Sequence, residues 1–346
     1  MTTPLSDRPR SQWFERTVPR LATLGRDRYH WLAHNPDNQP PHALTQHIPE
    51  INEIELDNSQ SQATAREGLH VAAWNLERGR HWREAAQLLQ AHPGLQSLDI
   101  LCLSEMDDGM ARSHNEHSTR ELALALGMNY AYGVEFLELS LGTPEEQAQT
   151  QGDNDRGYHG NAILSRLPLQ SPRLLRLPGG ERWYDAAEKR LGGRIALFAD
   201  IQLGAQVVTV VSTHLESGPE NQQRRTQEGQ LILQAIATHY GDRPIILGGD
   251  LNAAPTTPVI QALRAAGFAF EESNDLTVST YQLQVNGRIQ PGKFHIDYVL
   301  TRGLAVAQAP PPAVIMAAYP CEPTGKMLSD HAIATTHLRL CSSVSR

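Results

Sequence analysis

Several apolar runs in this sequence end in a side chain that can bind a metal ion or transfer a proton. Asn75 follows LHVAAW, Glu105 follows DILCLS, His214 follows VVTVVST, and Asp250 and Asn252 follow PIILGG. The runs have the length and composition of buried strands. Sites are commonly built where a rigid strand gives way to a loop. We therefore expect these five side chains to meet at one edge of a sheet.

Three further polar groups belong to later apolar runs. Asp330 and His331 begin the run in LSDHAIATT, and they reach the same edge if that strand is antiparallel to the others. Asp297 lies inside FHIDYVL, where a lone buried carboxylate is costly unless it is hydrogen-bonded. A histidine such as His331 would satisfy it. The sequence therefore predicts an Asp297–His331 pair.

These residue types permit hydrolysis of a phosphate ester. Asn75, Glu105 and Asp330 offer hard oxygen ligands, which suit Mg²⁺ or Mn²⁺ better than zinc. An imidazole held by a carboxylate is an efficient general base, so His331 with Asp297 could deprotonate an attacking water.

The other polar groups have supporting roles in the same reaction. Asp250 could orient the water or assist the leaving group, and Asn252 could donate to a phosphoryl oxygen. His214 could stabilise the negative charge that grows in the transition state. Taken one at a time, these residues could equally be strand caps or surface acids. The ordered set of eight favours a phosphoester hydrolase.

The elements that position these groups are strands mixed with helices. From Leu69 onward, short apolar runs bounded by Gly, Pro, Asn and Asp recur. Helical patterns lie between some of them, at 81–92, 118–127, 221–240 and 257–267, while other strands are separated by turn-length gaps. This mixture predicts sheets with antiparallel pairs and helices outside them rather than a repeating βαβ array.

The first 66 residues differ in pattern from the rest of the chain. A helical pattern runs from Ser11 to Trp31 with an interruption at Pro19, and polar, proline-containing sequence comes after it. We interpret 1–66 as a partly helical N-terminal extension plus linker, 67–342 as the catalytic domain and 343–346 as a tail. The acidic stretch 143–157 is expected to be a loop that borders a cleft.

Composition excludes several classes of protein. With 30 basic and 38 acidic residues, the net charge of −8 argues against binding of polyanions by overall charge. Cys102, Cys321 and Cys341 are too scattered for a disulfide framework or a structural zinc site. The sequence contains neither a signal-peptide pattern nor the ~20 apolar residues of a membrane span. We expect a cytoplasmic protein with no obligate protein partner.

The order of the motifs resembles a known family. WNLERG, LSE, GNAILSR, STHLES, GGDLNAAP, HIDYVL and LSDH are similar to the motifs of the endonuclease/exonuclease/phosphatase superfamily, from about Leu69 to Leu340. The resemblance implies an α/β fold of two packed mixed β-sheets flanked by helices, a four-layer α/β sandwich. It also implies metal-dependent hydrolysis of phosphoesters.

The resemblance also assigns roles to individual residues. It implies a divalent metal at Glu105 and Asn75. The family's Asp/His pair falls on Asp297 and His331, its phosphate-binding histidine on His214, and its GDxN residues on Asp250 and Asn252. Two further positions, Asn161 in HGNAILSR and Arg190 in EKRLGGRIAL, are implied to line the cleft and bind substrate.

The substrate is less well defined, because nucleases, phosphatases and phospholipid phosphodiesterases share this catalytic set. The continuation of GGDLNAAP is more similar to deadenylase-like members than to inositol-polyphosphate phosphatases. We expect a Mg²⁺- or Mn²⁺-dependent phosphodiesterase or nuclease, acting on nucleic acid or a nucleotide-like ester. A phosphatase, a phospholipid phosphodiesterase and a noncatalytic binding module are the alternatives. Trp74, Trp82 and Trp183 are candidates for stacking on bases, although Trp74 is more typical of a core or a cleft wall.

Overall fold

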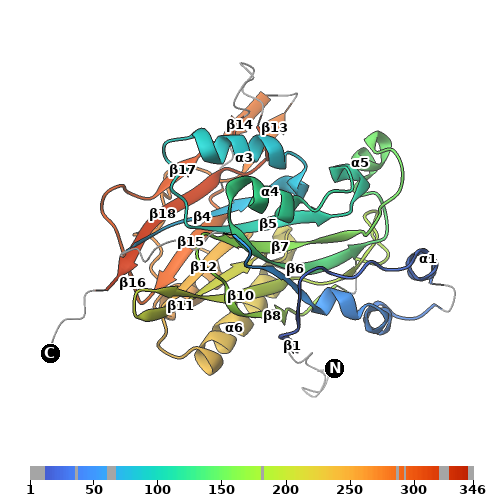
Figure 1. Cartoon of the computed structure of the whole chain (residues 1–346), viewed down its shortest axis with the longest axis horizontal. Coiled ribbons are helices and arrows are strands. Elements are labelled where there is room, and N and C mark those ends of the chain that lie inside the picture. Colours follow the sequence, from blue (N-terminus) through green and yellow to red (C-terminus); the bar gives the residue numbers. More distant parts are fainter. Residues whose placement is uncertain are drawn as a thin grey trace.

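Two mixed β-sheets pack face to face, and helices cover their outer sides (Figure 1). The computed structural model describes residues 12–35, 38–60, 68–180, 183–285, 288–291, 294–318 and 327–341. Within these residues the order of the layers is helix, sheet, sheet, helix. The predicted four-layer α/β sandwich is confirmed.

The strands divide between a six-stranded and a ten-stranded sheet. The six-stranded sheet has the order β1 (Gln12–Phe14), β8 (Gln170–Arg176), β10 (Ile195–Leu203), β11 (Gln206–Thr213), β12 (Ile245–Asp250) and β15 (Asp297–Arg302). The ten-stranded sheet has the order β16 (Leu304–Val306), β18 (Ile333–Leu340), β4 (Gly68–Asn75), β5 (Ile100–Asp108), β7 (Tyr158–Ser165), β6 (Asn129–Glu138), β3 (Ile54–Asp57) and β2 (Thr17–Val18), with β17 (Ala313–Ile315) on β18 and β9 (Arg190–Gly192) on β6. A separate hairpin consists of β13 (Gln282–Val285) and β14 (Arg288–Pro291).

The helices lie between the strands in sequence and outside the two sheets in space. They are α1 (Arg26–His34), α2 (Pro41–Leu44), α3 (Trp82–Ala91), α4 (Ser118–Leu126), α5 (Pro144–Gln149), α6 (Gln222–His239) and α7 (Pro258–Ala265), with 3₁₀ turns at Thr45–His47, Pro49–Asn52, Glu77–Gly79, Ala111–Ser113 and Pro219–Asn221. Helices α3 and α4 cover the outer face of the larger sheet, and α6 covers that of the smaller sheet (Figure 1). Helix α7 packs into the same apolar cluster as α6.

The central strands are buried on both faces. In β5, Ile100 and Cys102 face the other sheet, whereas Leu101 and Leu103 face the helices. Successive side chains of a strand point to opposite faces, so both faces must be apolar and the sequence reads as a continuous apolar run. Cys102 is fully buried, as its place in such a run suggests.

The direction of the strands brings the predicted polar residues to one edge. Strand β4 is parallel to β5 and β11 is parallel to β12, with α3 and α6 in the respective crossovers. The carboxyl ends of these four strands therefore lie at the same edge. Strands β15 and β18 are antiparallel to their neighbours β12 and β4, so their first residues lie there too.

The helix predicted from Ser11 to Trp31 is wrong over its first part. Gln12–Phe14 is a strand paired with β8, and Thr17–Val18 is a strand paired with β3. A helix begins only at Arg26. The sheet edges supplied by β8 and β3, both distant along the chain, offer hydrogen bonds that a local pattern does not anticipate.

The segment before residue 66 joins both sheets, since β1 belongs to the smaller sheet and β2 and β3 to the larger one. The acidic stretch 143–157 is not all loop, because it contains α5. Thr143 and Glu146 form a capping box at the start of that helix, which explains why this polar sequence is helical. None of the described helices is long and apolar enough to cross a membrane.

Some of the predicted features lie outside the described residues. They are the start of the N-terminal extension at 1–11, the linker at 61–67, Cys321 and the tail at 343–346.

Candidate active site

The pairing of β12 with β15 places two predicted aspartates side by side. Asp250 is the register partner of Asp297 at the end of this antiparallel pair. The sequence GGD before this point has a steric reason. Gly249 has φ +143, and a Cβ there would lie 1.9 Å from the carbonyl oxygen of Thr213 on the neighbouring strand. Only glycine allows β12 to deliver Asp250 at this distance from β11.

His331 and Asp297 form the predicted pair. Nδ1 of His331 lies 2.8 Å from Oδ2 of Asp297, which is fully buried. Nε2 of His331 points toward Asp250 and Asp330, at 3.8 Å and 3.9 Å. Burial opposes the charged imidazolium, but Asp297 and Asp250 hold the pKa of His331 well above its usual value. His331 is therefore a strong base with its second nitrogen directed at the two other carboxylates.

Asp250 is the most connected carboxylate of the site. Its Oδ1 accepts from the backbone N–H of Asn252 at 2.8 Å, and its Oδ2 accepts from the amide of Asn75 at 3.2 Å. Oδ2 also lies 3.5 Å from Nε2 of His214. Burial, and then the charge of Asp297, raise the pKa of Asp250 to about 7. Asp250 thus carries negative charge that its neighbours compensate only in part.

Glu105 is delivered by an irregularity in β5. The pairing with β7 shifts between Leu103 and Met106, and Glu105 has a left-handed backbone with φ 57. Such bulges turn a side chain out of the regular alternation, and strain of this kind is common at functional sites. Oε1 of Glu105 accepts from Asn75 at 3.1 Å.

The second oxygen of Glu105 contacts a residue that we did not predict. Oε2 accepts from Arg78 at 3.1 Å, and Arg78 also contacts Glu146 on α5 and Glu188. Burial favours the protonated carboxyl, but the charge of Arg78 is the strongest opposing influence and holds the pKa of Glu105 well below its usual value. Arg78 lies a short distance after Asn75 in WNLERG, and that proximity is the only signal in the sequence.

The predicted metal ligands lie close together, but the amide of Asn75 is not oriented to bind an ion through its oxygen. The amide nitrogen of Asn75 faces Glu105 and Asp250, while its oxygen accepts from the backbone N–H of Glu77 at 3.1 Å. Asn75 therefore joins two carboxylates instead of presenting its oxygen to an ion. The backbone N–H of Asp330 donates to Glu77 at 3.1 Å, which adds another acid beside the site.

The donor set fits a divalent cation. Burial and the charges of neighbouring acids raise the pKa values of Glu77 and Asp330, so negative charge is crowded here. A hard cation with oxygen ligands would relieve this repulsion. Among the described residues, the ligand atoms of Asp250, Asp297 and His331 lie within 4.8 Å of one another, a spacing that a metal ion could bridge. Nδ1 of His331 is already engaged with Asp297, which leaves Asp250 as the member of this group best placed to share an ion with Glu105 and Asp330.

His214 and Asn252 lie beside Asp250 as predicted. Burial and the charge of Arg194 lower the pKa of His214 well below its usual value, so the imidazole is neutral. The side chain of Asn252 donates to the carbonyl oxygen of Leu215 at 3.0 Å and ties the loop after β12 to the loop after β11.

The two predicted substrate-binding residues have different positions. Arg190 lines the cleft, lies 3.3 Å from Glu138, and its guanidinium carbon lies over the rings of Phe136 and Trp183 at 4.1 Å and 3.9 Å from their centroids. Asn161 does not line the cleft, because it is fully buried and its amide donates to Glu135 at 3.1 Å. The prediction that Asn161 contacts substrate is therefore not supported by its position.

Asn161 reaches the cleft only indirectly. Glu135 pairs with Arg194 at 3.1 Å, and Arg194 lines the cleft. The strand pattern marks Asn161 as polar among apolar residues, but it does not say on which side of the sheet its partner lies.

The catalytic groups lie in a cleft of about 710 Å³. Its charged and aromatic lining includes, besides the predicted residues, Arg78, His159, Trp183, Glu188, Arg194, Arg225, Tyr281 and Phe294. These residues come from β7, α6 and several loops. Trp183 was a stacking candidate in the sequence. The other residues were not predicted, because their contribution depends on long-range packing that motif spacing does not show.

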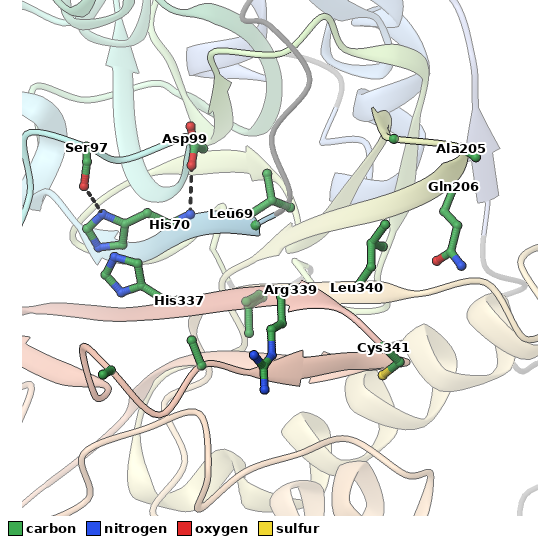
Figure 2. Close-up of a pocket in the computed structure, with 15 residues that line it drawn as sticks. Leu69, His70, Ser97, Asp99, Ala205, Gln206, His337, Arg339, Leu340 and Cys341 are labelled. Carbon is green, nitrogen blue, oxygen red and sulfur yellow. Dashed lines mark hydrogen bonds between the residues drawn. The ribbon is translucent and has the colours of Figure 1, made fainter. Parts of the chain in front are cut away.

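A second hollow, of about 820 Å³, lies at the opposite end of β4 and β18 (Figure 2). Its main polar feature is a pair of stacked imidazoles, His70 and His337, with ring centroids 3.8 Å apart. The ring nitrogens of His70 lie 3.0 Å from Ser97 and 2.7 Å from Thr335. Burial and His337 lower the pKa of His70 to about 4. Both nitrogens of His70 are engaged with hydroxyl groups, so His70 is not available to bind a metal ion or transfer a proton in this arrangement.

Comparison with known proteins identifies the family. The model of the Endonuclease/Exonuclease/phosphatase family matches residues 72–331. The chain belongs to this family, whose members are hydrolases acting on phosphoester bonds. No curated protein sequence matches the chain.

Solved structures share the fold. An endonuclease/exonuclease/phosphatase from Beutenbergia cavernae DSM 12333 is 21% identical with a TM-score of 0.58, covering 80% of this chain and 73% of that chain. The human Nocturnin catalytic domain with bound sulfate is 18% identical with a TM-score of 0.53, covering 88% and 100%. D. rerio TDP2 complexed with a single-strand DNA product is 18% identical with a TM-score of 0.50, covering 79% and 100%. At these identities the similarity concerns the fold.

Proposed function

We propose that the chain is a phosphodiesterase of the nuclease type that depends on Mg²⁺ or Mn²⁺. The observation that carries this proposal is the 2.8 Å contact between His331 and Asp297, with the other imidazole nitrogen directed at Asp250. A base held by a buried acid beside further carboxylates is suited to activating water for attack on phosphorus.

The proton transfer follows from this geometry. Asp297 accepts the hydrogen bond from Nδ1 of His331, which leaves Nε2 free to accept a proton in the neutral imidazole. Nε2 and Oδ2 of Asp250 are 3.8 Å apart, so one water molecule can contact both groups. Asp250 orients the water and His331 takes its proton. The hydroxide attacks the phosphorus, the opposite bond from phosphorus to the ester oxygen breaks, and the leaving alkoxide takes up a proton from solvent water.

The phosphoryl group is bound by donors on the other side of Asp250. Neutral His214 lies at 3.5 Å from Asp250 and can donate to a phosphoryl oxygen, and Arg194 adds positive charge. Glu105, Asp250 and Asp330 are the residues that would hold the divalent cation, which supplies neutralisation of the phosphate charge when bound. These donors favour the transition state because its negative charge exceeds that of the substrate.

The first experiment is hydrolysis of a chromogenic phosphate diester and of the matching monoester. Purified protein is assayed with Mg²⁺, with Mn²⁺ and with a chelator. We expect metal-dependent cleavage of the diester. Asp250→Ala is the matched control and should abolish turnover, with an unchanged circular dichroism spectrum. Preference for the monoester would instead identify a phosphatase, and near-normal rates in Asp250→Ala would refute the mechanism.

A further inference from the structure

The three tryptophans that the sequence offered as stacking residues have different surroundings in the structure. Trp74 is fully buried and its indole N–H donates to the carbonyl oxygen of His331 at 3.1 Å. Trp82 lies on α3, donates to Glu116 at 2.8 Å and does not line the cleft. Trp183 lines the cleft. Of the three, it alone can contact a substrate bound at the catalytic groups.

Trp183 is held as a rigid platform. Its backbone N–H donates to Gly180 at 3.1 Å, and its carbonyl oxygen accepts from Arg190 at 3.1 Å. The Arg190 guanidinium carbon lies 3.9 Å from the indole centroid, and the ring of Phe136 packs edge-on at 5.6 Å. The Arg190 guanidinium and the Phe136 ring therefore hold the indole in place at the wall of the cleft that Trp183 lines. A preordered aromatic face loses little entropy when a planar ring stacks on it.

A second aromatic residue lies near His331. Phe294 is 51% exposed and is, among the described residues, the large exposed apolar side chain that lines the cleft. Its backbone is fixed, because its carbonyl oxygen accepts from the N–H groups of Thr280 and Tyr281 at 3.2 Å. Tyr281 in turn packs against His331, with ring centroids 5.2 Å apart. Phe294 is thus an exposed aromatic ring on a fixed backbone beside the catalytic base.

The order of the strands places these two aromatic residues at opposite ends of the cleft. The carbonyl oxygen of Trp183 accepts a hydrogen bond from Arg190, the first residue of β9. His331 lies just before the start of β18 at Ile333. In the larger sheet the path from β18 to β9 runs through β4, β5, β7 and β6. With about 4.8 Å between neighbouring strands, the ends of this path are on the order of 20 Å apart. Asn75 and Glu105 come from β4 and β5, between the two ends.

We propose that Trp183 and Phe294 are stacking platforms for unpaired bases on the two sides of the scissile phosphate. The natural substrate is then a single-stranded nucleic acid that is longer than one nucleotide, since a stacked strand rises only about 3.4 Å per nucleotide. Aromatic platforms beside positive charge are the usual means of holding single strands. This inference rests on the proposed phosphodiesterase function and adds the substrate class and the residues that select it.

The rest of the lining argues against a lipid substrate. Arg78, Glu188 and Arg194 lie along the same cleft, and an acyl chain placed there would desolvate these charges without compensation. A base offers a π-face to the indole and polar edges to the charged groups. The cleft therefore suits a nucleotide better than a hydrocarbon chain.

The test compares binding of two labelled oligonucleotides of equal length by fluorescence anisotropy in the presence of chelator. One is oligodeoxythymidylate and the other has the same backbone with abasic units. We expect Trp183→Ala and Phe294→Ala each to weaken binding of the base-bearing strand by roughly 5- to 150-fold, with little change for the abasic strand. Trp183→Phe should restore most of the affinity. Trp82→Ala is the matched control and should bind both strands like the wild type.

Two results would overturn the inference: equal losses on both strands, or no loss with the base-bearing strand. Hydrolysis of the chromogenic diester by the wild type distinguishes absence of the stacking platforms from absence of the proposed phosphodiesterase activity. If the wild type cleaves the diester and Asp250→Ala does not, while binding is independent of Trp183 and Phe294, the phosphodiesterase stands and the platforms do not exist. If the diester is not cleaved but binding depends on the bases through Trp183, the platforms stand and the proposed reaction fails.

Discussion

Replacing Asp297 by Asn removes the charge that supports His331 and keeps the shape of the side chain. The Asn oxygen can still accept from Nδ1 of His331, so the 2.8 Å contact and the orientation of the ring are retained. The substitution removes the negative charge from a fully buried position. The imidazolium form of His331 is stabilised by that charge, so Asp297→Asn lowers the pKa of His331.

The size of the change can be bracketed. A hydrogen bond to a charged group contributes about 1 to 1.5 kcal/mol more than a neutral one, which is about 1 pKa unit. Removing a unit charge about 4 Å away at an effective dielectric constant of 20 costs about 4 kcal/mol, or about 3 units, and is the upper limit. We expect the pKa of His331 to fall by between about 1 and 3 units. Since a weaker base transfers the proton less readily, kcat should fall by about 10- to 100-fold at its pH optimum.

The assay is the pH dependence of kcat on the chromogenic diester at saturating metal ion. A general base is active when deprotonated, so kcat rises with pH through the pKa of the base and then levels. In Asp297→Asn this rise should move to lower pH, and the loss relative to wild type should be smallest at low pH. A rise at the same pH in both proteins would show that His331 is not the base supported by Asp297. Thermal unfolding of both proteins controls for loss of structure.

Individual contacts lead to three further predictions. Glu105→Gln should weaken Mn²⁺ binding by about 100-fold or more, because it removes a charged ligand, and calorimetric titration with Mn²⁺ would measure the change; an unchanged affinity would place the ion elsewhere. Arg112→Ala should lower the free energy of unfolding by about 3 to 5 kcal/mol in urea denaturation, since it removes the guanidinium that pairs with the fully buried carboxylate of Asp107 at 2.9 Å. Arg83→Ala, which breaks an exposed pair with Glu116, is the control and should leave the unfolding free energy unchanged. Gly249→Ala should destabilise the protein and reduce kcat together, because the Cβ would meet the Thr213 carbonyl and displace Asp250; a fully active, stable variant would contradict the close approach of β12 and β11.

The sequence alone was enough to locate the edge at which the site is built. Runs such as LHVAAW and PIILGG are apolar because their strands are buried on both faces, and each run continues until the chain reaches the edge of the sheet. The polar residue at the end of each run must therefore lie at that edge. This local rule, with the order of the motifs, was sufficient for Asn75, Glu105, His214, Asp250 and His331.

Tertiary structure decided which groups contact one another. The first strands of the chain were mistaken for helix because of their pairing partners. β1 pairs with β8, which is distant in sequence, and β2 pairs with β3, which the sequence analysis did not recognise as a strand. Asn161 has the same polar-in-apolar signature as Glu105, yet it faces Glu135 inside the protein. Arg78 reaches Glu105 only because the backbone turns through a left-handed conformation after Asn75.

One physical cause explains why the sequence predicted the edge of the site but not the contacts within it. Burial and strand alternation are properties of a short stretch of chain, so the pattern of a few consecutive residues predicts them. Contacts between side chains depend on which strands become neighbours, and that is settled by the packing of the two sheets as a whole. Trp183 illustrates the distinction, because no local feature separates it from Trp82, and only the path of the chain between β8 and β9 brings it to the cleft.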